Sequence, residues 1–398
     1  MKKIFIVAGE ASGDYIGGRL MQDINYLDKD VKFCGIGGDC MKAAGLKTLF
    51  PVEELSVIGI CEVIGKIFRI NRLINKTVAA ILRYKPQIVV TIDSSGFTHR
   101  VNRRLKKHFA HESSSLRSVQ RSPFIIHYVA PPVWAWRSWR AKNMGKFIDK
   151  LLTLFPFEPP LFSKFALKTE FVGHPIVGDT DFIKPHPNKL GEFQKNILKS
   201  AGGPVICLLP GSRMSEIERH MPILRNFVRF MTAKYADVKF IISTIAPLVN
   251  EIKKYTKSWV TSPLVIAEKH EKVLALYSSD IAVAASGTVT LELANTNVPF
   301  IVIYKTSVIT YILVKFLIKI NRVCLINILA NNDVVPELLQ WQCTAENIFQ
   351  HVCGLLQNAS AVERQRRSFQ KVMDCLCQKN PRHAAVEVLS SVGWYGKF

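Results

Sequence analysis

Short runs of apolar residues recur along the chain, and each is followed by glycine, serine or proline and then by a helical pattern. Continuous apolar strands that alternate with helices are typical of parallel sheets with helices on both faces. The pattern therefore predicts an α/β protein, and the two sets of runs predict two Rossmann-like domains. The runs lie at residues 4–10, 87–96, 124–132, 150–158, 204–213, 238–247, 280–288 and 299–306.

A polar, proline-rich stretch at residues 173–204 separates the two sets of runs, and we interpret it as the linker. The N-terminal domain then covers residues 1–175, and the C-terminal domain covers residues 176–370. In open parallel sheets, ligands bind at the carboxyl ends of the strands. The loops that directly follow the apolar runs are therefore where we expect the functional residues.

The loop LLPGSRMSEIE at residues 208–218 has the features of an anion site. Gly211 lets the backbone approach a ligand closely, and free amides at the start of a helix favour an anion. Arg213 can bind a phosphate oxygen with its fork of donors. Ser215 and Glu218 fit a capping box and predict where the helix begins. The alternative is an ordinary strand-to-helix turn with an exposed arginine.

The loop AASGTVTLELA at residues 284–294 repeats this arrangement. Ser286, Gly287 and Thr288 follow a predicted strand and open a helix, where hydroxyl groups and free amides can bind phosphate. Glu292 shares a helix face with Thr288, so its carboxylate is a candidate acceptor for ribose hydroxyls. A capped helix with a solvent-facing glutamate is the alternative. Together the two loops predict a site for the diphosphate of a nucleotide-sugar.

Neither loop is a Walker A or a GxGxxG motif, which argues against a kinase and against a dinucleotide-dependent dehydrogenase. The motif GEASGD at residues 9–14 follows the first predicted strand. Gly9 and Gly13 permit tight turns, and Glu10, Ser12 and Asp14 supply polar groups that suit sugar hydroxyls better than phosphate. Capping of the first helix by its serine or aspartate is the alternative.

Asp93 ends the predicted strand that begins at Gln87. A carboxylate at this place could take a proton from an acceptor hydroxyl as that hydroxyl attacks an anomeric carbon. An Asx turn or a helix cap is the alternative. We interpret His127 as a strand histidine rather than as a base. The tryptophan-rich segment at residues 129–140 could contact a sugar, an acyl chain or the membrane interface, or could pack in the core.

Residues 57–76 predict an amphipathic helix with an apolar stripe and a basic opposite face. This pattern is typical of a helix that lies on an anionic membrane surface, and packing against the core is the alternative. The basic stretch at residues 99–121 is interpreted as a solvated surface. The candidate membrane-facing residues are Ile60, Ile64, Ile67 and Phe68.

The formal net charge of +22 predicts attraction to a polyanion, which could be nucleic acid, an anionic membrane or a phosphorylated substrate. A generally basic composition with solvated lysines is the alternative. The nine cysteines are odd in number and form no CxxC pair, which argues against a zinc site and against a secreted disulfide framework. We therefore expect reduced thiols in a cytosol. The most apolar region, residues 298–330, contains four basic residues, so no membrane span is expected. The N-terminal apolar run from Ile4 to Ala8 has only five residues and leads into a Gly-acid loop, so no signal peptide is expected.

Seven motifs occur in the order found in lipid-A-disaccharide synthases, and the chain resembles this family over residues 3–345. GEASGD with VWAWR is specific, whereas PGSR and SGT are shared more widely. The motifs are GEASGD (9–14), PPVWAWR (131–137), FPFE (155–158), FVGHP (171–175), LLPGSR (208–213), ASGTVTLE (285–292) and NILANNDVVPELLQ (327–340).

The resemblance implies a GT-B fold, in which two Rossmann-like domains with parallel sheets face a central cleft. It implies an inverting, metal-independent glycosyltransferase without a cofactor. Such an enzyme transfers 2,3-diacylglucosamine from UDP to the 6-hydroxyl of 2,3-diacylglucosamine 1-phosphate (lipid X). The products are a β-1,6-linked disaccharide and UDP, on the path to lipid A.

The resemblance also implies roles for single residues. Asp93 would be the base, with Glu10 and Ser12 near the acceptor or the reacting sugar. The N-terminal domain would bind the acceptor and face the membrane, and the C-terminal domain would bind the UDP-sugar. The implied substrate- and nucleotide-binding residues are Gly9, Gly13, Arg213, Ser286, Gly287, Thr288, Glu292 and Asn327.

The resemblance implies peripheral attachment to the anionic cytoplasmic face of the inner membrane of a Gram-negative bacterium. It implies no nucleic-acid partner, and the protein is expected to be a monomer or a homodimer. Residues 371–398 are expected to form a C-terminal helix that packs back on the N-terminal domain or on a partner subunit. The sequence departs from the family around the base, where IDAPDF is common and this chain has IDSSGF at 92–97. Gly96 replaces the second acidic residue, and residues 111–121 resemble an insertion.

Two other interpretations remain open. The first is another GT-B enzyme that uses UDP-N-acetylglucosamine, such as a 2-epimerase or a lipid-linked transferase, and it would share the SGT loop and Glu292. The second is a basic membrane- or nucleic-acid-binding protein without catalysis. The first would accept an unacylated UDP-sugar, and the second would not depend on Asp93.

Overall fold

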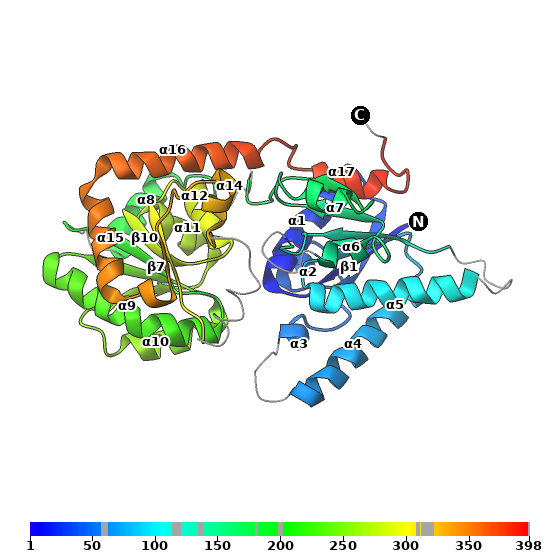
Figure 1. The fold of residues 1–398 in the computed structure, drawn as a ribbon, viewed down its shortest axis with the longest axis horizontal. Helices are drawn as coiled ribbons and strands as arrows, with labels where there is room; N and C mark the ends of the chain where they lie inside the picture. The colour runs from blue at the N-terminus through cyan, green and yellow to red at the C-terminus, as the bar shows by residue number, and fades with distance from the viewer. Residues whose placement is uncertain are drawn as a thin grey trace. The chain divides into compact units, whose positions relative to one another are not determined.

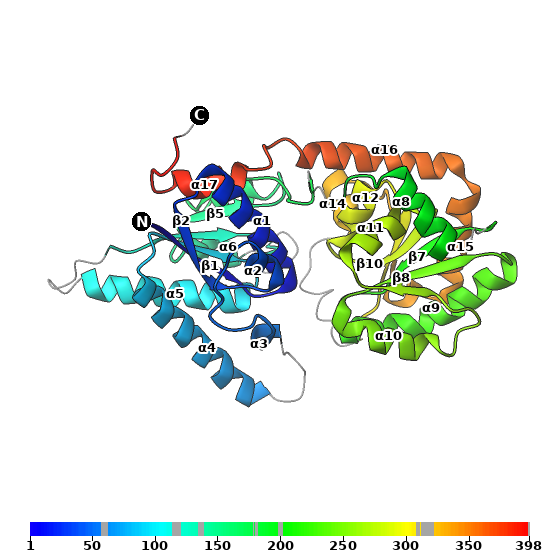
Figure 2. The same cartoon turned by 180° about the vertical axis from the view of Figure 1, so that it is seen from behind.

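The computed structural model describes residues 1–56, 63–113, 121–133, 139–177, 179, 182–197, 202–307, 311 and 322–396. The chain divides into two compact units, each built on a parallel sheet with flanking helices (Figures 1 and 2). Unit 1 comprises Met1–Pro175 with Leu376–Phe398, and unit 2 comprises Ile176–Cys375. Unit 1 is therefore discontinuous in sequence.

The sheet of unit 1 has six parallel strands in the order β2-β1-β3-β4-β5-β6. Its central strands are mainly apolar and almost entirely buried, because helices cover both faces of the sheet. The strands are β1 (Lys2–Ala8), β2 (Val31–Ile36), β3 (Ile88–Ile92), β4 (Phe124–Tyr128), β5 (Lys150–Thr153) and β6 (Lys168–Phe171).

One core of unit 1 lies between this sheet and the helices α4 and α5, where Ile74, Ile81, Val101 and Leu105 are fully buried. The helix α17 returns from the end of the chain and packs against α1. The helices of unit 1 are α1 (Ala11–Leu27), α2 (Asp39–Ala43), α3 (Glu53–Ser56), α4 (Val63–Tyr84), α5 (Ser95–Ser113), α6 (Trp139–Met144), α7 (Pro159–Ser163) and α17 (His383–Ser390).

The sheet of unit 2 also has six parallel strands, in the order β12-β11-β10-β7-β8-β9. Its strands β7, β10 and β11 again consist of buried apolar residues. The strands are β7 (Val205–Leu209), β8 (Lys239–Ser243), β9 (Leu264–Ile266), β10 (Ile281–Ala285), β11 (Phe300–Tyr304) and β12 (Glu337–Leu339).

The largest core of unit 2 lies where α9 and α15 cover this sheet, with Phe227 and Ile348 fully buried. The helix α16 packs on β11 through stacked rings of Phe300 and Phe369, 5.3 Å apart. The helices are α8 (Pro187–Glu192), α9 (Met214–Lys234), α10 (Val249–Thr256), α11 (Lys269–Tyr277), α12 (Val289–Asn295), α14 (Leu325–Ala330), α15 (Ala345–Gln357) and α16 (Ala359–Leu376).

The structure corrects two expectations that were drawn from the sequence. The predicted linker at 173–204 is wrong over most of its length, because the chain already packs on unit 2 soon after Pro175. Asp179 pairs with Lys269 of α11 at 3.2 Å, and the hydroxyl of Tyr277 donates to the carbonyl of Phe182. The predicted helix at 57–76 is α4, which extends to Tyr84 and buries its C-terminal half in the core. Residues 57–62 lie outside the described residues.

Among the described residues, no helix has both the length and the apolar character needed to cross a membrane. The C-terminal segment is held to unit 1 by both apolar and ionic contacts. Ala385 and Val388 of α17 are fully buried, Lys150 forms an ion pair with Glu387, and His383 lies 3.3 Å from Glu170. The end of the chain therefore completes the first unit.

Candidate active site

In both sheets the candidate loops lie at the point where the strand order reverses. In unit 1, β1 and β3 are neighbours while β2 lies on the other side of β1, so GEASGD and Asp93 follow the two strands that flank this point. In unit 2, β7 and β10 are neighbours, and they lead into the PGSR and SGT loops. The crevice at such a point is where open parallel sheets bind ligands.

Asp93 and Ser94 both adopt left-handed backbone conformations, with φ of 49° and 44°. Such conformations cost energy for residues other than glycine and cluster at functional sites. Neighbouring groups hold the turn: the amide of Asp93 donates to the carbonyl of Tyr128 at 3.0 Å, and Thr98 Oγ1 donates to the Asp93 carbonyl at 2.7 Å. Asp93 Oδ1 accepts from the Ser94 amide at 2.7 Å. This bond to the next residue leaves Oδ2 for the contact with Ser12.

The structure brings the GEASGD loop and the Asp93 turn together. Ser12 Oγ lies 3.5 Å from Asp93 Oδ2. Gly9 permits this approach, because a Cβ there would lie 2.4 Å from Ser94 Oγ. A Cβ at Gly13 would lie 3.4 Å from the Ile92 carbonyl oxygen, so the helix start also packs tightly on β3. Glu10 occupies the N-cap position of α1 and is exposed.

Asp14 has a structural task instead of the sugar contact or the cap of α1 considered from the sequence. Its carboxylate is buried and accepts hydrogen bonds from the amides of Gly38, Cys40 and Met41 at 2.7, 2.9 and 3.1 Å. These amides lie at the start of α2, so Asp14 holds the loop after β2 against α1. Neither Ser12 nor Asp14 caps the first helix.

A buried pair of histidines lies beneath the Asp93 turn, and no local sequence pattern predicts this pairing. His127 Nδ1 lies 2.9 Å from Thr91 Oγ1, and its Nε2 lies 3.3 Å from Nε2 of His99 on α5. Burial lowers the pKa of His127 to about 3 and that of His99 to about 2, so both rings are neutral near pH 7. His127 is fully buried on β4, which agrees with its interpretation as a strand histidine.

The PGSR loop differs from prediction in how its helix begins. α9 starts at Met214, and Glu216 rather than Glu218 reaches back to the loop, so the predicted capping box at Ser215 is wrong. Glu216 Oε2 accepts from the amides of Ser212 and Arg213 at 2.9 and 3.3 Å. This carboxylate occupies two of the amides that we expected to bind an anion.

Arg213 nevertheless projects from the PGSR loop. Its side chain is 69% exposed and lies 3.4 Å from Glu216 Oε1. Behind it, His220 Nε2 accepts from the Lys305 amide at 3.0 Å, so its Nδ1 carries the proton that it donates to the Pro210 carbonyl at 2.7 Å. Burial lowers the pKa of His220, which keeps it in this neutral form. The loop after β7 is thus fixed to the end of β11.

Some positions of the SGT loop are accessible to a ligand, and others already use their side chains in contacts within the protein. Thr288 is exposed at the N-cap position of α12, and a Cβ at Gly287 would meet nothing within 4 Å. Ser286 Oγ donates to the Val323 carbonyl at 2.8 Å, which holds the loop against the segment before α14. Glu292 forms an ion pair with Lys272 of α11. Its carboxylate therefore already has a cationic neighbour in unit 2.

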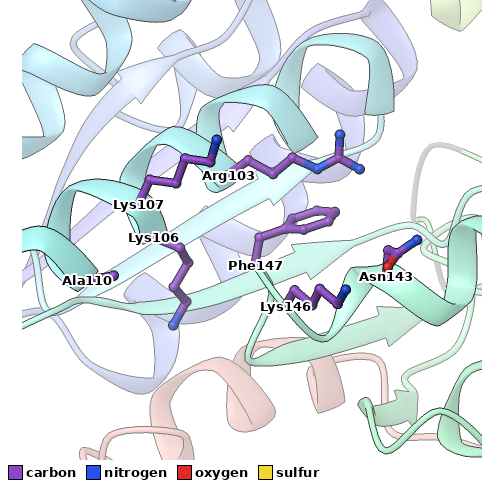
Figure 3. A pocket seen from close by; sticks show the side chains of 7 residues that line it. All are labelled: Arg103, Lys106, Lys107, Ala110, Asn143, Lys146 and Phe147. Carbon is purple, nitrogen blue, oxygen red and sulfur yellow. The ribbon is translucent and has the colours of Figure 1, made fainter.

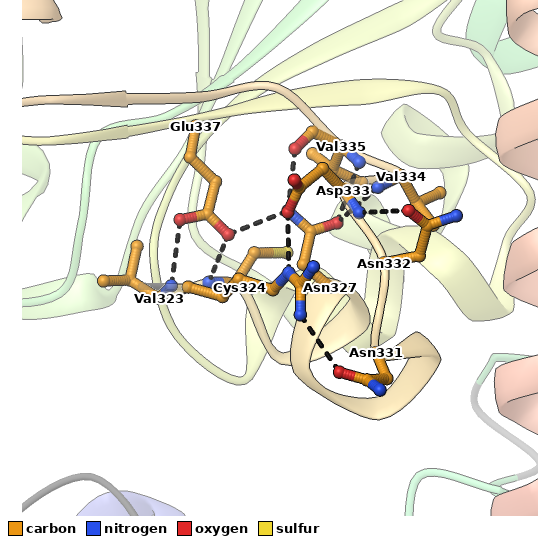
Figure 4. A network of polar contacts seen from close by, with 10 residues as sticks. Val323, Cys324, Asn327, Asn331, Asn332, Asp333, Val334, Val335 and Glu337 are labelled. Carbon is orange, nitrogen blue, oxygen red and sulfur yellow. Dashed lines mark hydrogen bonds and ion pairs between the residues drawn. The ribbon is translucent and has the colours of Figure 1, made fainter. Parts of the chain in front are cut away.

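Asn327 is buried at the centre of a loop network (Figure 4). Its Nδ2 donates to the Val335 carbonyl and to Glu337 Oε1, both at 2.8 Å, and its Oδ1 accepts from the amides of Val334 and Val335 at 2.9 and 2.8 Å. Both donors and both lone pairs of the amide are used. We therefore propose that Asn327 holds this loop in place rather than contacting a nucleotide itself.

The remaining predicted positions are less completely described. Phe68 on α4 is 73% exposed. Ile60, residues 134–138 of the tryptophan-rich segment and most of the insertion at 111–121 lie outside the described residues, as do the side chains of Ile64 and Ile67. Around Gly96, the departure from the family motif, a Cβ would meet nothing within 4 Å, so packing does not require glycine there.

Structural comparisons identify the fold. The S. aureus MnaA–UDP complex is 12% identical, covers 100% of this chain and 98% of its own, and superposes with a TM-score of 0.65. The UDP-GlcNAc 2-epimerase of Neisseria meningitidis bound to UDP-GlcNAc is 12% identical, with coverage of 98% and 99% and a TM-score of 0.62. Together with the two parallel sheets, these similarities show a GT-B fold and, at such low identity, nothing about activity.

Sequence comparisons are more specific. A family model described as lipid-A-disaccharide synthetase matches residues 4–389. The lipid-A-disaccharide synthase of Gluconobacter oxydans is 38% identical over 373 residues, which are 94% of this chain and 86% of that protein. The one from Rickettsia bellii is 37% identical over 404 residues, with 98% of each chain covered. By these matches, and with the motifs placed around both strand reversals, the chain belongs to the lipid-A-disaccharide synthase family.

Proposed function

We propose that this chain transfers 2,3-diacylglucosamine from UDP to the 6-hydroxyl of 2,3-diacylglucosamine 1-phosphate, with Asp93 as the general base. The observation that supports this role is the Asp93–Ser94 turn, where two consecutive residues hold left-handed conformations at the carboxyl edge of a parallel sheet. The activity is that of the family, a glycosyltransferase of lipid A biosynthesis. The products are the β-1,6-linked disaccharide and UDP.

In the proposed reaction, the acceptor hydroxyl attacks the anomeric carbon of the donor while the bond to the UDP oxygen breaks. Asp93 Oδ2 takes the hydroxyl proton, since Oδ1 is already occupied by the Ser94 amide. Ser12, 3.5 Å from Oδ2, orients this oxygen, and exposed Glu10 on the same loop is assigned to the acceptor or reacting sugar. Attack opposite the leaving group inverts the configuration at that carbon.

We assign the UDP leaving group to the two loops of unit 2. Arg213 supplies positive charge from an exposed position, and Thr288 with the open backbone at Gly287 supplies donors at the start of α12. Positive potential at the diphosphate stabilises the charge that develops as UDP departs. Glu292 would receive a ribose hydroxyl while keeping its pairing with Lys272.

The test is Asp93→Asn, because asparagine retains the Oδ1 acceptor that closes the turn. We expect turnover to fall by about 10²- to 10⁴-fold, the usual contribution of a general base. UDP affinity, measured by calorimetry, and the thermal midpoint should stay unchanged. Asp30→Asn, an exposed carboxylate on the loop before β2, is the matched control and should retain full activity. Full turnover by the Asp93 variant would remove this residue as the base.

The substrate assay separates the proposed transferase from an enzyme that uses UDP-N-acetylglucosamine. Purified protein given UDP-2,3-diacylglucosamine and the acylated 1-phosphate should release UDP and a disaccharide. If unacylated UDP-N-acetylglucosamine serves equally well, the assigned substrates are wrong. A protein without catalysis would release no UDP from either mixture.

We further propose that unit 1 attaches peripherally to the anionic cytoplasmic face of the inner membrane through α4. The first half of α4 carries exposed Phe68 next to exposed Arg69 and Arg72, whereas its second half is anchored in the core through Ile74 and Ile81. An apolar side chain flanked by cations is suited to the headgroup region of such a membrane. The anchoring of the second half explains why the first half can project.

Phe68→Glu should weaken sedimentation with vesicles that contain phosphatidylglycerol, because it places a negative charge at the proposed contact. We expect about a tenfold loss in partitioning, since it removes apolar burial and adds repulsion. Ile183→Glu makes the same charge change at a residue of unit 2 that is 64% exposed, and it should bind vesicles normally. Equal binding by the two variants would contradict the assignment of α4.

A further inference from the structure

A basic pocket in unit 1 has no role in the proposed reaction. It has a volume of about 400 Å³ and lies between α5 and the segment that joins α6 to β5 (Figure 3). Arg103 and Lys107 extend from α5, and Lys146 and Phe147 come from the opposite wall. The full lining is Arg103, Lys106, Lys107, Ala110, Asn143, Lys146 and Phe147.

The pocket lies away from the Asp93 turn. α5 begins directly after that turn, and Arg103 is eight residues along it, or about 12 Å at the rise of a helix. Lys146 and Phe147 lie within four residues of the start of β5, so they are near the amino ends of the strands, opposite the edge that carries Asp93. A group bound there is too far away to take part in the chemistry at the turn.

The charges in the pocket are unbalanced. Of its four cationic side chains, Lys106 is neutralised by Asp149, whose oxygens lie 2.7 and 2.9 Å from Nζ. Asp149 Oδ2 also accepts from the Ile125 amide at 2.8 Å, so this carboxylate is committed. No acidic residue is present among the described residues that line the pocket. Arg103, Lys107 and Lys146 therefore line the pocket without a carboxylate beside them among its described lining residues.

The arrangement is also held in place. The Arg103 guanidinium lies 4.6 Å from the centre of the Phe147 ring. Phe147 is 3% exposed, and its ring is 5.3 Å from that of buried His99. The cation–π contact restricts the conformations of the Arg103 side chain. The buried Phe147 ring forms a rigid floor of the pocket. Arg103 and Lys107 are four residues apart on one helix face, where like charges repel unless an anion lies between them.

We propose that this pocket binds a phosphate group that carries two negative charges. Three cations and the Asn143 amide offer donors on both walls, which matches the several oxygens of a phosphate better than the two of a carboxylate. The group could belong to a lipid headgroup such as phosphatidic acid or to a free phosphate. The proposal does not depend on glycosyl transfer, since none of the lining residues was assigned to that reaction.

Lysine footprinting tests the site directly. Inorganic phosphate should protect Lys107 and Lys146 of the full-length protein from acetylation, measured by mass spectrometry, and should not protect Lys142, an exposed lysine on α6 outside the pocket. Asp93→Asn should show the same protection, which separates this site from the proposed catalysis. Equal acetylation of all three lysines with and without phosphate would overturn the proposal.

Affinity provides the second measurement. Lys107→Ala with Lys146→Ala should bind inorganic phosphate at least about tenfold more weakly, because it removes two charge-assisted contacts. Arg100→Ala with Lys142→Ala removes the same charge from exposed positions on α5 and α6 outside the pocket and should bind as the wild type does. Equal weakening in the two double variants would show a general charge effect and refute the pocket.

Vesicles distinguish the two sources of phosphate. If the source is a lipid, phosphatidylcholine vesicles with phosphatidic acid should bind the wild type and the control pair better than the pocket pair. If the source is a free phosphate, all three proteins should bind these vesicles equally while the differences in phosphate affinity persist. Both results support the pocket, and they assign its ligand.

Discussion

Gly211 and Gly287 lie in the two loops assigned to UDP, but a side chain at each would meet different surroundings. At Gly211, φ is +123° and a Cβ would lie 2.3 Å from Glu216 Oε2. At Gly287, nothing lies within 4 Å. The fold therefore requires glycine at position 211. At position 287 the surrounding protein would leave room for a side chain.

This contrast predicts different effects for the same substitution. Gly211→Ala should lower the free energy of unfolding by about 1–3 kcal/mol, because it combines backbone strain with the loss of the Glu216 contact. Gly287→Ala should leave stability unchanged and weaken UDP binding, since its methyl group would enter the space assigned to the diphosphate. Denaturant unfolding and UDP calorimetry on both variants provide the check. Normal UDP affinity in Gly287→Ala would place the nucleotide elsewhere.

Several polar residues of the motifs could be located from the sequence but not assigned. Asp14, Ser286 and Asn327 were all candidates for ligand contact, yet each uses its side chain to hold a neighbouring loop. The local sequence of a strand-end loop shows which polar groups are present. It does not show which distant amide or carbonyl will meet them, because those partners come from other loops of the sheet.

At the scale of single elements, the sequence predicted eight of the strands, and the four that it missed are the edges of the two sheets: β2, β6, β9 and β12. Central strands such as β3 and β10 are buried at every position and read as continuous apolar runs. Edge strands have one neighbour and partial exposure, as in KTEF of β6, so their composition mixes polar and apolar residues. Their position follows only from the tertiary arrangement.

The contact between α5 and β4 through His99 and His127 predicts a dependence of stability on pH. Both pKa values are lowered in the folded protein, to about 2 and about 3, from an ordinary value of 6.5. At pH values between about 3 and 6.5, the unfolded chain binds more protons than the folded protein. The free energy of unfolding therefore decreases as the pH falls below about 6.5. Each buried histidine contributes a slope of about 1.4 kcal/mol per pH unit.

His127→Gln tests this coupling, because it removes one of the two titrating groups. We propose to measure the free energy of unfolding between pH 6.0 and pH 5.0. Its slope against pH should become shallower by about 1.4 kcal/mol per pH unit. His351→Gln, which changes an exposed histidine of α15, should keep the wild-type slope. Identical slopes in the two variants would mean that the buried pair is not a source of acid sensitivity.

At the scale of the whole molecule, the two units differ in how the chain builds them. Unit 2 is one continuous segment, Ile176–Cys375, whereas unit 1 needs both ends of the chain. The return of the C-terminal segment to unit 1 was an expectation drawn from the family resemblance, since nothing in the local pattern of residues 376–398 names its partner. The contacts of α17 with α1 and the pairing of Lys150 with Glu387 supply that partner.

A fragment of residues 176–375 should therefore fold by itself and bind UDP, because both loops assigned to the nucleotide and the reversal of strand order lie within it. A fragment of residues 1–175 should be less stable than the same fragment joined by a flexible linker to 376–398, since it lacks the helix that covers α1. Circular dichroism melting and UDP calorimetry distinguish these outcomes. A folded 176–375 fragment without UDP affinity would contradict the assignment of the nucleotide to unit 2.

The discontinuity of unit 1 also sets an order of events during synthesis on the ribosome. Residues 1–175 contain all six strands of the sheet, but the helix that covers α1 emerges only after the 200 residues of unit 2. At about 5–20 residues per second, synthesis of unit 2 takes roughly 10–40 s, and during this time the face of α1 that α17 covers is exposed. Until residues 376–398 have emerged, this apolar face is a natural contact for a chaperone, and these residues displace it.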